Sequence, residues 1–538
     1  MTIDEAYSAA LLARLADFFT EEAISWPRRL WDVGSVLALE EILEAGSWET
    51  RGVLSAGAVD WQRNELRRII GPDVGLGTGE LRRELTQTLN GRIPDPSPAR
   101  RQLAHLIEHA RGGYLERWQA ALTSANPPKV ERLSRTVASH LLDLGFSRPF
   151  LADQVAGLRR KRATAEETLS VASELARRKP TEFSVLVGLV AIPRRDDLTG
   201  GLDSWRTKAQ VAAWIKQNSF STEGVRIGGG FEFDFQARDA YGAAAQARAL
   251  VDRLVARSTY LRRDRDGVRP FPSVWVAGHP EPIQLATPPR GADVLSLAQE
   301  GHMYRVAESH NQIDDALELA APLNRGALGP AVAGAWAAVE ALLTDPDDPR
   351  DEERFGKAVA ADRLAAIITC SWPRAELTSL AHHYRPNDSS DELADSLAKC
   401  NTNLERSRVF AEAMMSGLQP TFQNYRKGSE YAAASRMHDL LTDPKRTLSD
   451  VRCAMTVAIR RLYRSRNIVL HGGSTQGVAL ESSLRTAAPL VGAGLDRIVH
   501  AALTEGIAPL DLAARAEVSL RLVAGETGLS VVELLEPR

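Results

Sequence analysis

The amino-acid sequence predicts a predominantly α-helical protein with a helical N-terminal region, a small central α/β module and a C-terminal helical bundle. Apolar residues recur at helical spacing in the first third of the chain and again from Ile313 onward. Residues 231–235 instead alternate apolar and acidic side chains, with the period of two that is typical of a strand. A chain of 538 residues is too long for one hydrophobic core. We therefore expect domains at 1–175, 176–292 and 300–505, followed by a short helical tail at 506–538.

Composition limits the classes of function. Hydrophobic residues make up 44% and charged residues 25% of the chain, which is ordinary for a globular protein. The formal net charge of −3 excludes a protein that coats nucleic acid through its overall charge, so any polyanion site must be a local patch. The longest apolar run, Phe183 to Ile192, is about half of what a membrane span needs, and the first residues lack a secretory pattern. The three cysteines lack metal-ligand spacing, so we expect a reduced, cytoplasmic protein with no membrane partner, no cofactor and no metal.

The N-terminal region is expected to be almost wholly helical. The stretches Ala9 to Phe19 and Val36 to Leu43 have helical apolar spacing, and the prolines at 94–98 separate helices. The glycines at 75–79 follow no strand and lack the Lys-Ser/Thr of a phosphate-binding loop, which favours an ordinary turn. The basic run Arg159 to Arg162 favours a solvated helix face over a phosphate site.

The central module contains the strand patterns. Phe183 to Ile192 is typical of a buried strand, and a long amphipathic helix is expected from Ala240 to Arg257 before a short strand at 273–277. Glu232 and Asp234 should point away from the neighbouring phenylalanines. A metal-dependent nuclease would use such carboxylates with a following lysine, but Gln236 and Arg238 follow here, so a solvent-facing stripe is the favoured interpretation.

The C-terminal region contains two helices of interest. The first spans Ala327 to Leu343 and carries an apolar stripe that includes Trp336 and Val339, with Glu340 beside it. The second runs from about Ser449, a plausible N-cap, to Leu470 and leads into His471-Gly472-Gly473. A last helix is expected from Thr486 to Leu503.

The end of the second helix contains an Arg-x4-His pattern, from Arg466 to His471. The bare spacing carries little information, because it also occurs from Arg100 to His105, from Arg135 to His140 and from Arg305 to His310. Only the pattern at 466 is followed directly by an asparagine, preceded by an aromatic and basic run, and closed by two glycines. These additions distinguish it from the other three.

The residue types around this pattern fit phosphodiester chemistry. A helix that ends at Gly472 would let His471 turn toward Arg466, and a histidine side chain gives or takes a proton near neutral pH. Arg466 offers a permanently charged fork for a phosphate, and Asn467 would orient a partner or a substrate oxygen. Tyr463 lies one turn earlier, where it would stack or donate a hydrogen bond. Three further arginines are expected to follow a polyanion backbone: Arg460, Arg461 and Arg464.

Arg466-Asn467-x3-His471 in a helical context resembles the Arg-x4–6-His motif of the HEPN superfamily, and its surroundings look most like the ApeA-like branch. The helix Trp336 to Leu343 resembles the one that opens such domains, with Val339 in place of a leucine. The resemblance covers roughly residues 310–503 and implies a metal-independent endoribonuclease that activates a ribose 2′-hydroxyl against its own phosphate. It assigns the phosphate to Arg466, acid or base work to His471, positioning to Asn467 and an accessory role to Glu340.

The resemblance also implies partners. Family members usually build the site between two copies of the motif, so a homodimer is expected, and many act in bacterial antiphage defence or toxin systems. Residues 1–300 would then sense a phage-derived trigger or recruit a protein partner, and RNA would be the substrate. Two alternatives remain: a catalytically silent HEPN-like module that serves dimerisation or interaction, and a metal-dependent nuclease centred on Glu232 and Asp234.

Overall fold

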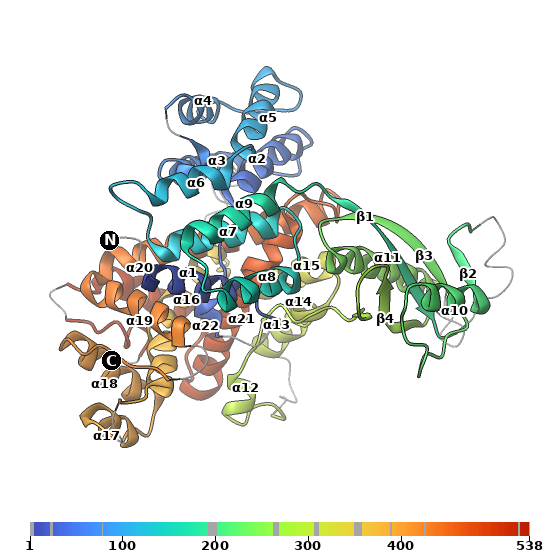
Figure 1. The fold of residues 1–538 in the computed structure, drawn as a ribbon. Coiled ribbons are helices and arrows are strands. Elements are labelled where there is room, and N and C mark those ends of the chain that lie inside the picture. The colour runs from blue at the N-terminus through green and yellow to red at the C-terminus, as the bar shows by residue number, and fades with distance from the viewer. Residues whose placement is uncertain are drawn as a thin grey trace. The chain divides into compact units, whose positions relative to one another are not determined.

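The computed structural model describes residues 5–21, 25–77, 79–191, 202–261, 268–305, 311–348, 358–387, 390–423, 427–525 and 528–536. These residues form mostly α-helices and one five-stranded antiparallel sheet, so the predominantly α fold class is confirmed (Figure 1). None of the helices in the described ranges is long and apolar enough to cross a membrane. His310 of the Arg305 pattern lies outside the described residues.

The chain divides into two compact units. The first, the helical unit, comprises residues 1–143, 155–173 and 289–538, and the second, the sheet unit, comprises residues 144–154 and 174–288. The sheet unit corresponds closely to the central module expected at 176–292. Apart from residues 144–154 and 174–175, the N-terminal region lies in the helical unit together with the C-terminal bundle and the tail, which were expected as separate parts.

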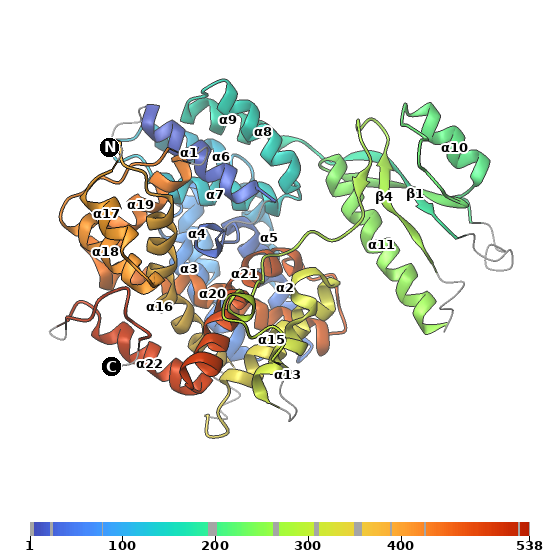
Figure 2. The same ribbon diagram turned by 90° about the horizontal axis from the view of Figure 1, so that it is seen from below.

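The N-terminal helices are mostly short and amphipathic, and the views of Figures 1 and 2 show them in blue and cyan. Their bounds are α1 Glu5–Phe19, η1 Trp26–Arg28, α2 Ser35–Thr50, α3 Ala56–Ile70, η2 Val74–Leu76, α4 Glu80–Thr88, α5 Pro98–Arg111, α6 Tyr114–Leu122, α7 Val130–Asp143, α8 Arg148–Arg160 and α9 Ala165–Arg177. The glycine-rich segment forms the short turn η2, capped by the Asp73 side chain, which confirms the turn for the described part of 75–79. Arg159 to Arg162 are exposed, as a solvated face requires.

The C-terminal helices build the core of the helical unit. Their bounds are α12 Ser296–Gln299, α13 Gln312–Ala320, α14 Pro322–Arg325, α15 Leu328–Leu343, α16 Ala358–His383, α17 Glu392–Ala398, α18 Asn403–Met415, α19 Lys427–Thr442, α20 Pro444–Leu470, α21 Leu480–His500 and α22 Pro509–Leu522, with a single π turn η4 at Ala501–Glu505. The long helices α15, α16, α20 and α21 pack on one another, and α22 packs on α16. Trp336, Trp372 and Leu512 are buried in this common core, so the tail is part of the bundle.

Two helix starts differ from the sequence prediction. Helix α20 begins at Pro444 because Asp443 is its N-cap, accepting a hydrogen bond from the Arg446 amide, and the proline fits the first helical position. Ser449 therefore lies inside the helix. Helix α21 begins at Leu480 and contains Pro489 in its interior, whereas the prediction began at Thr486.

A buried network of ion pairs joins the two halves of the helical unit. Arg28 of η1 donates to Glu376 of α16 at 2.9 Å and to Glu430 of α19 at 2.6 Å. Arg14 of α1 donates to Glu131 of α7 at 2.8 Å. Arg436 donates to Glu376 at 2.8 Å and to Glu131 at 3.3 Å, so it connects both clusters. Charges that would ordinarily stay in water hold the N-terminal helices on the C-terminal bundle.

The sheet unit has the strand order β2-β3-β1-β4-β5. Its bounds are β1 Thr181–Leu189, β2 Trp205–Thr207, α10 Lys208–Gln217, β3 Gly229–Ala237, α11 Ala240–Tyr260, β4 Pro270–Val276 and β5 Ile283–Gln284. Val185 and Val187 of β1 pack against α11, whereas Leu186 between them packs with the side chains of α10. The sheet is therefore covered by a helix on each face, which explains why β1 is a nearly continuous apolar run.

Candidate functional site

The candidate site lies at the carboxyl end of helix α20. The helix ends at Leu470, His471 is its C-cap, and the amides of His471 and Gly472 both donate to the Asn467 carbonyl, at 2.9 and 3.3 Å. Gly473 has a φ of +63°, a conformation that favours glycine. The glycine pair therefore ends the helix and places the exposed His471 beyond its last turn, as the sequence predicts.

Arg466 and His471 are in direct contact. The Arg466 Nη1 atom lies 2.8 Å from His471 Nε2 and 3.0 Å from Asn467 Oδ1. A guanidinium only donates, so Nε2 accepts the hydrogen bond and the ring carries its proton on Nδ1. The Arg466 guanidinium therefore donates hydrogen bonds to both the Asn467 amide oxygen and the His471 imidazole at the end of one helix. We call Arg466, Asn467 and His471 the motif cluster.

The other described Arg-x4-His pairs are engaged elsewhere. Arg100 donates to the Leu43 carbonyl, while the exposed His105 lies 3.7 Å from Glu108. His140 is buried and its ring lies 4.5 Å from that of Tyr114. The spacing alone does not create the contact; the helix end does.

Tyr463 and Glu340 lie where helices α15 and α20 pack. The Tyr463 ring lies 4.6 Å from that of Trp336, and the Trp336 indole donates to Glu340 at 2.9 Å. Gly329, near the start of α15, lies beside Val469 and Thr475, so α15 runs antiparallel to α20. Glu340 is four residues beyond Trp336 and therefore lies farther from Arg466 along this axis than Trp336 does. Its described contact supports the packing of Trp336 and Tyr463.

The three basic residues expected to follow a polyanion are buried and paired. Arg461 donates to both carboxylate oxygens of Glu41 at 2.9 Å, and Arg464 donates to the same carboxylate at 3.1 Å. Arg460 pairs with Asp362 and lies 4.4 Å from the Trp61 ring centroid. Each of these arginines is at most 8% exposed. This placement does not fit a role in contacting an RNA backbone, because their charge is already neutralised inside the helical unit.

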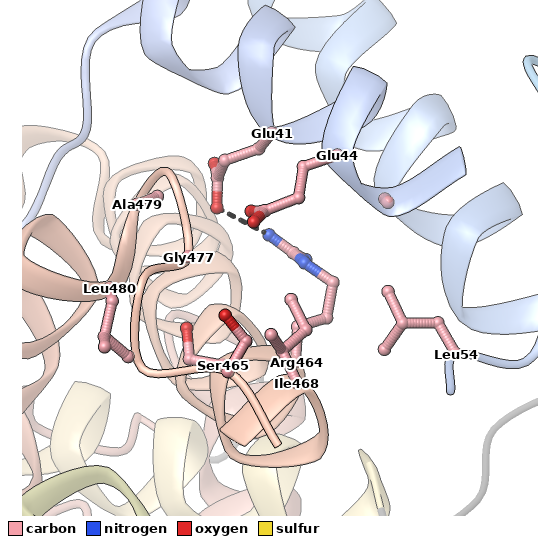
Figure 3. Close-up of a pocket in the computed structure, with 11 residues that line it drawn as sticks. Glu41, Glu44, Leu54, Arg464, Ser465, Ile468, Gly477, Ala479 and Leu480 are labelled. Atoms are coloured by element: carbon pink, nitrogen blue, oxygen red, sulfur yellow. Dashed lines mark hydrogen bonds and ion pairs between the residues drawn. The ribbon is translucent and has the colours of Figure 1, made fainter. Parts of the chain in front are cut away.

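Sequence reasoning missed the contribution of helix α2. A small cavity next to the motif cluster is lined by Glu41 and Glu44 of α2, by Arg464, Ser465 and Ile468 of α20, and by the segment that follows (Figure 3). Its volume of about 20 Å³ is enough for a water molecule but not for a nucleobase. No local pattern marks Glu41 or Glu44 as partners of α20, since the two helices are more than 400 residues apart in sequence.

Glu44 is a carboxylate at this cavity whose pKa is raised. Burial raises the pKa of Glu44, while hydrogen bonds from the Val478 amide and the Trp48 side chain lower it, and the net change is upward. Nearby Glu41 adds to the rise and Arg464 opposes it. The carboxylate thus anchors residues that follow His471 at some cost in desolvation.

The carboxylates of strand β3 are arranged for structure. Glu232 accepts hydrogen bonds from Arg206 at 2.7 Å, Trp214 at 2.8 Å and Ser184 at 3.0 Å. Burial raises the pKa of Glu232, but the hydrogen bonds from these three donors lower it by a larger amount, so the net change is downward. Asp234 is exposed, and within the described ranges no group of histidine, cysteine and acidic side chains is placed to hold a metal ion. The arrangement favours a paired and solvent-facing stripe over a metal-dependent nuclease site.

We expect Glu232→Ala to destabilise the sheet unit without changing any activity of the motif cluster. The substitution leaves Arg206, Trp214 and Ser184 without their shared acceptor, which should cost roughly 1–3 kcal/mol in the free energy of unfolding. Urea unfolding measures this loss. Asp234→Ala, on the same strand and exposed, is the matched control and should change stability by less than about 0.5 kcal/mol. Loss of a divalent-metal-dependent activity in Asp234→Ala would contradict this assignment.

Comparisons with protein-family models, curated protein sequences and solved structures find no match to this chain. The resemblance to the HEPN superfamily therefore stays a prediction that rests on the residues of α15 and α20.

Proposed function

We propose that this protein is a metal-independent endoribonuclease of the HEPN type. The observation that supports the proposal best is the contact between Arg466 and His471 at an exposed helix end, with Asn467 on the same guanidinium. A phosphate binder that keeps its charge thus lies next to a group that takes or gives a proton.

The two side chains satisfy each other when no substrate is present. A phosphodiester competes for the Arg466 guanidinium, because a doubly hydrogen-bonded anion is a better partner than a neutral imidazole. Binding of the phosphate would then free the Nε2 lone pair of His471. His471 would therefore be able to accept a proton only when a phosphate is bound to Arg466.

The reaction follows from these groups. His471 Nε2 takes the proton of a ribose 2′-hydroxyl, the 2′-oxygen forms a bond to the adjacent phosphorus, and the bond from phosphorus to the 5′-oxygen breaks. The products are a 2′,3′-cyclic phosphate and a 5′-hydroxyl, whose oxygen receives a proton from a histidinium or from water. Arg466 stabilises the charge that builds up on the phosphoryl oxygens, and Asn467 holds Arg466 in position.

RNA is the substrate in this proposal, and a second copy of the chain is the expected partner. A symmetric pair would bring two Arg466 side chains together and raise the local positive charge, although the chain has a net charge of −3. A role in bacterial antiphage defence or in a toxin system, with a trigger or protein partner bound by residues 1–300, is the context that the resemblance suggests.

The requirement for a 2′-hydroxyl gives a direct test. The purified protein should cleave an RNA oligonucleotide in EDTA, and the 5′ fragment should carry a cyclic phosphate. An otherwise identical oligonucleotide with a single 2′-deoxyribose at the cleaved position should resist cleavage at that position. The measurement is product analysis by mass spectrometry. Cleavage of the 2′-deoxy substrate, or an absolute need for divalent metal, would contradict the proposed reaction.

A second candidate is a catalytically silent HEPN-like module that serves dimerisation or interaction. The burial of Arg460, Arg461 and Arg464 favours it, because these residues do not contribute a basic surface beside the motif cluster. This candidate predicts no RNA cleavage under any condition. It also predicts that Arg466→Ala and His471→Ala leave self-association, measured by analytical ultracentrifugation, unchanged.

A further inference from the structure

The segment that follows His471 is held by helix α2 at two points. The first is Gly472, which lies against the indole ring of Trp48. A Cβ atom at position 472 would lie 2.8 Å from Trp48 Cζ3 and 2.6 Å from the Ile468 carbonyl oxygen. Only a glycine leaves room for this approach, so the Trp48 ring fixes the backbone directly after His471.

The second point is the amide of Val478. It donates to both carboxylate oxygens of Glu44, at 3.2 and 3.1 Å. Figure 3 shows Glu44 on α2 facing the loop that carries Gly477. The two contacts enclose residues 472–478, so the loop cannot swing away from α2 without breaking them.

Helix α2 itself is anchored on α20. Glu41 lies one turn before Glu44 and accepts hydrogen bonds from Arg461 and Arg464, both buried. The same helix packs against α3, α5 and α7 of the N-terminal half. It is therefore a rigid support with ties to the body of the motif helix and to the loop that leaves it.

From this geometry we propose that Glu44 and Trp48 are positioning residues for His471, an inference that rests on the proposed ribonuclease function. His471 is the C-cap of α20, so the helix fixes its backbone from the amino-terminal side only. Contacts with α2 fix the loop on the other side. Together they hold the imidazole within reach of Arg466, where it lies 2.8 Å away. Without them, the residues after the helix end would sample many conformations, of which few keep this contact.

Variants of Glu44 test the inference through the loop itself. In Glu44→Ala the Val478 amide loses a charged acceptor, and its hydrogen exchange should accelerate by about 10- to 100-fold, as measured by mass spectrometry of peptides covering 472–478. The Cε1 resonance of His471, observed by selective ¹³C labelling, should shift or broaden. Glu44→Gln keeps a side-chain oxygen acceptor and should retain most of the protection. Glu40→Gln is the matched control, because Glu40 lies on α2 but pairs with Arg111 of α5.

Kinetics separate positioning from a merely structural role. Glu44→Ala should lower kcat for RNA cleavage by roughly tenfold or more with KM nearly unchanged, and Glu44→Gln should restore it. Equal exchange in Glu44→Ala, Glu40→Gln and the wild type would overturn the inference. Should Glu44→Ala fold poorly, Gly472→Ala serves instead, since its added Cβ displaces the Trp48 ring and leaves the Glu44 carboxylate in place. A wild-type chain that does not cleave RNA would overturn the proposed reaction, and the exchange and the His471 resonance would still decide the positioning.

Discussion

Replacing His471 with alanine is expected to abolish RNA cleavage while leaving the fold intact. General acid or base catalysis contributes about 10²- to 10⁴-fold to a rate, and His471 Nε2 is the proton acceptor that lies within hydrogen-bond distance of Arg466 in the motif cluster. Its side chain is exposed, so the free energy of unfolding should change by less than about 0.5 kcal/mol. The measurement is kcat for a defined RNA beside a urea unfolding curve.

His105→Ala is the matched control for this substitution. His105 also follows an arginine by five positions and is exposed on a helix, but Arg100 turns to other partners. The control variant should cleave at the wild-type rate. Arg466→Lys keeps the charge and loses the planar fork, so it should lose most of the activity as well. Full cleavage by His471→Ala would contradict the proposed reaction and favour the silent module.

The geometry of the motif cluster could be predicted from sequence because it is local. Gly473 takes a positive φ directly after the end of α20, and Arg466, Asn467 and His471 all lie within the last turns before it. The packing of Trp336 on α20 also follows from an apolar stripe. Each of these features depends on a pattern within a single helix or at its end, which can be recognised from the sequence.

The roles of the other arginines depend on distant residues. The sequence predicts that Arg461 and Arg464 contact a polyanion, whereas the structure pairs both with Glu41 of α2, which is 420 positions from Arg461. A long helix with charges on several sides does not reveal which side is covered. Sequence patterns also do not reveal that Arg28 and Glu376, 348 positions apart, form a buried pair between the two halves of one unit.

Replacing Glu376 with alanine should have the largest effect on stability. Glu376 is fully buried and is the shared acceptor of Arg28 and Arg436. Its removal leaves two guanidinium groups inside the helical unit short of a counter-charge, which should cost about 3–5 kcal/mol in the free energy of unfolding. Urea unfolding measures the loss. Glu412→Ala on α18, where the side chain is exposed, is the matched control and should be nearly neutral.

Glu376 and its arginine partners also predict how the free energy of unfolding depends on pH. Burial raises the pKa of Glu376, but Arg436 and Arg28 lower it by a larger amount, so the net change is downward. The pKa of Glu131 is likewise held well below its usual range by Arg14, Arg436 and Arg135. A carboxyl group with a depressed pKa in the folded state stabilises the fold at pH values above its unfolded pKa, near 4.3. That stability is lost as the pH falls through the folded pKa, because the unfolded chain then binds more protons. The free energy of unfolding should therefore fall more steeply below about pH 5 in the wild type than in Glu376→Gln, which has no proton to take up at this position. Equal slopes in the two proteins would mean that the charge on Glu376 does not hold the halves of the helical unit together.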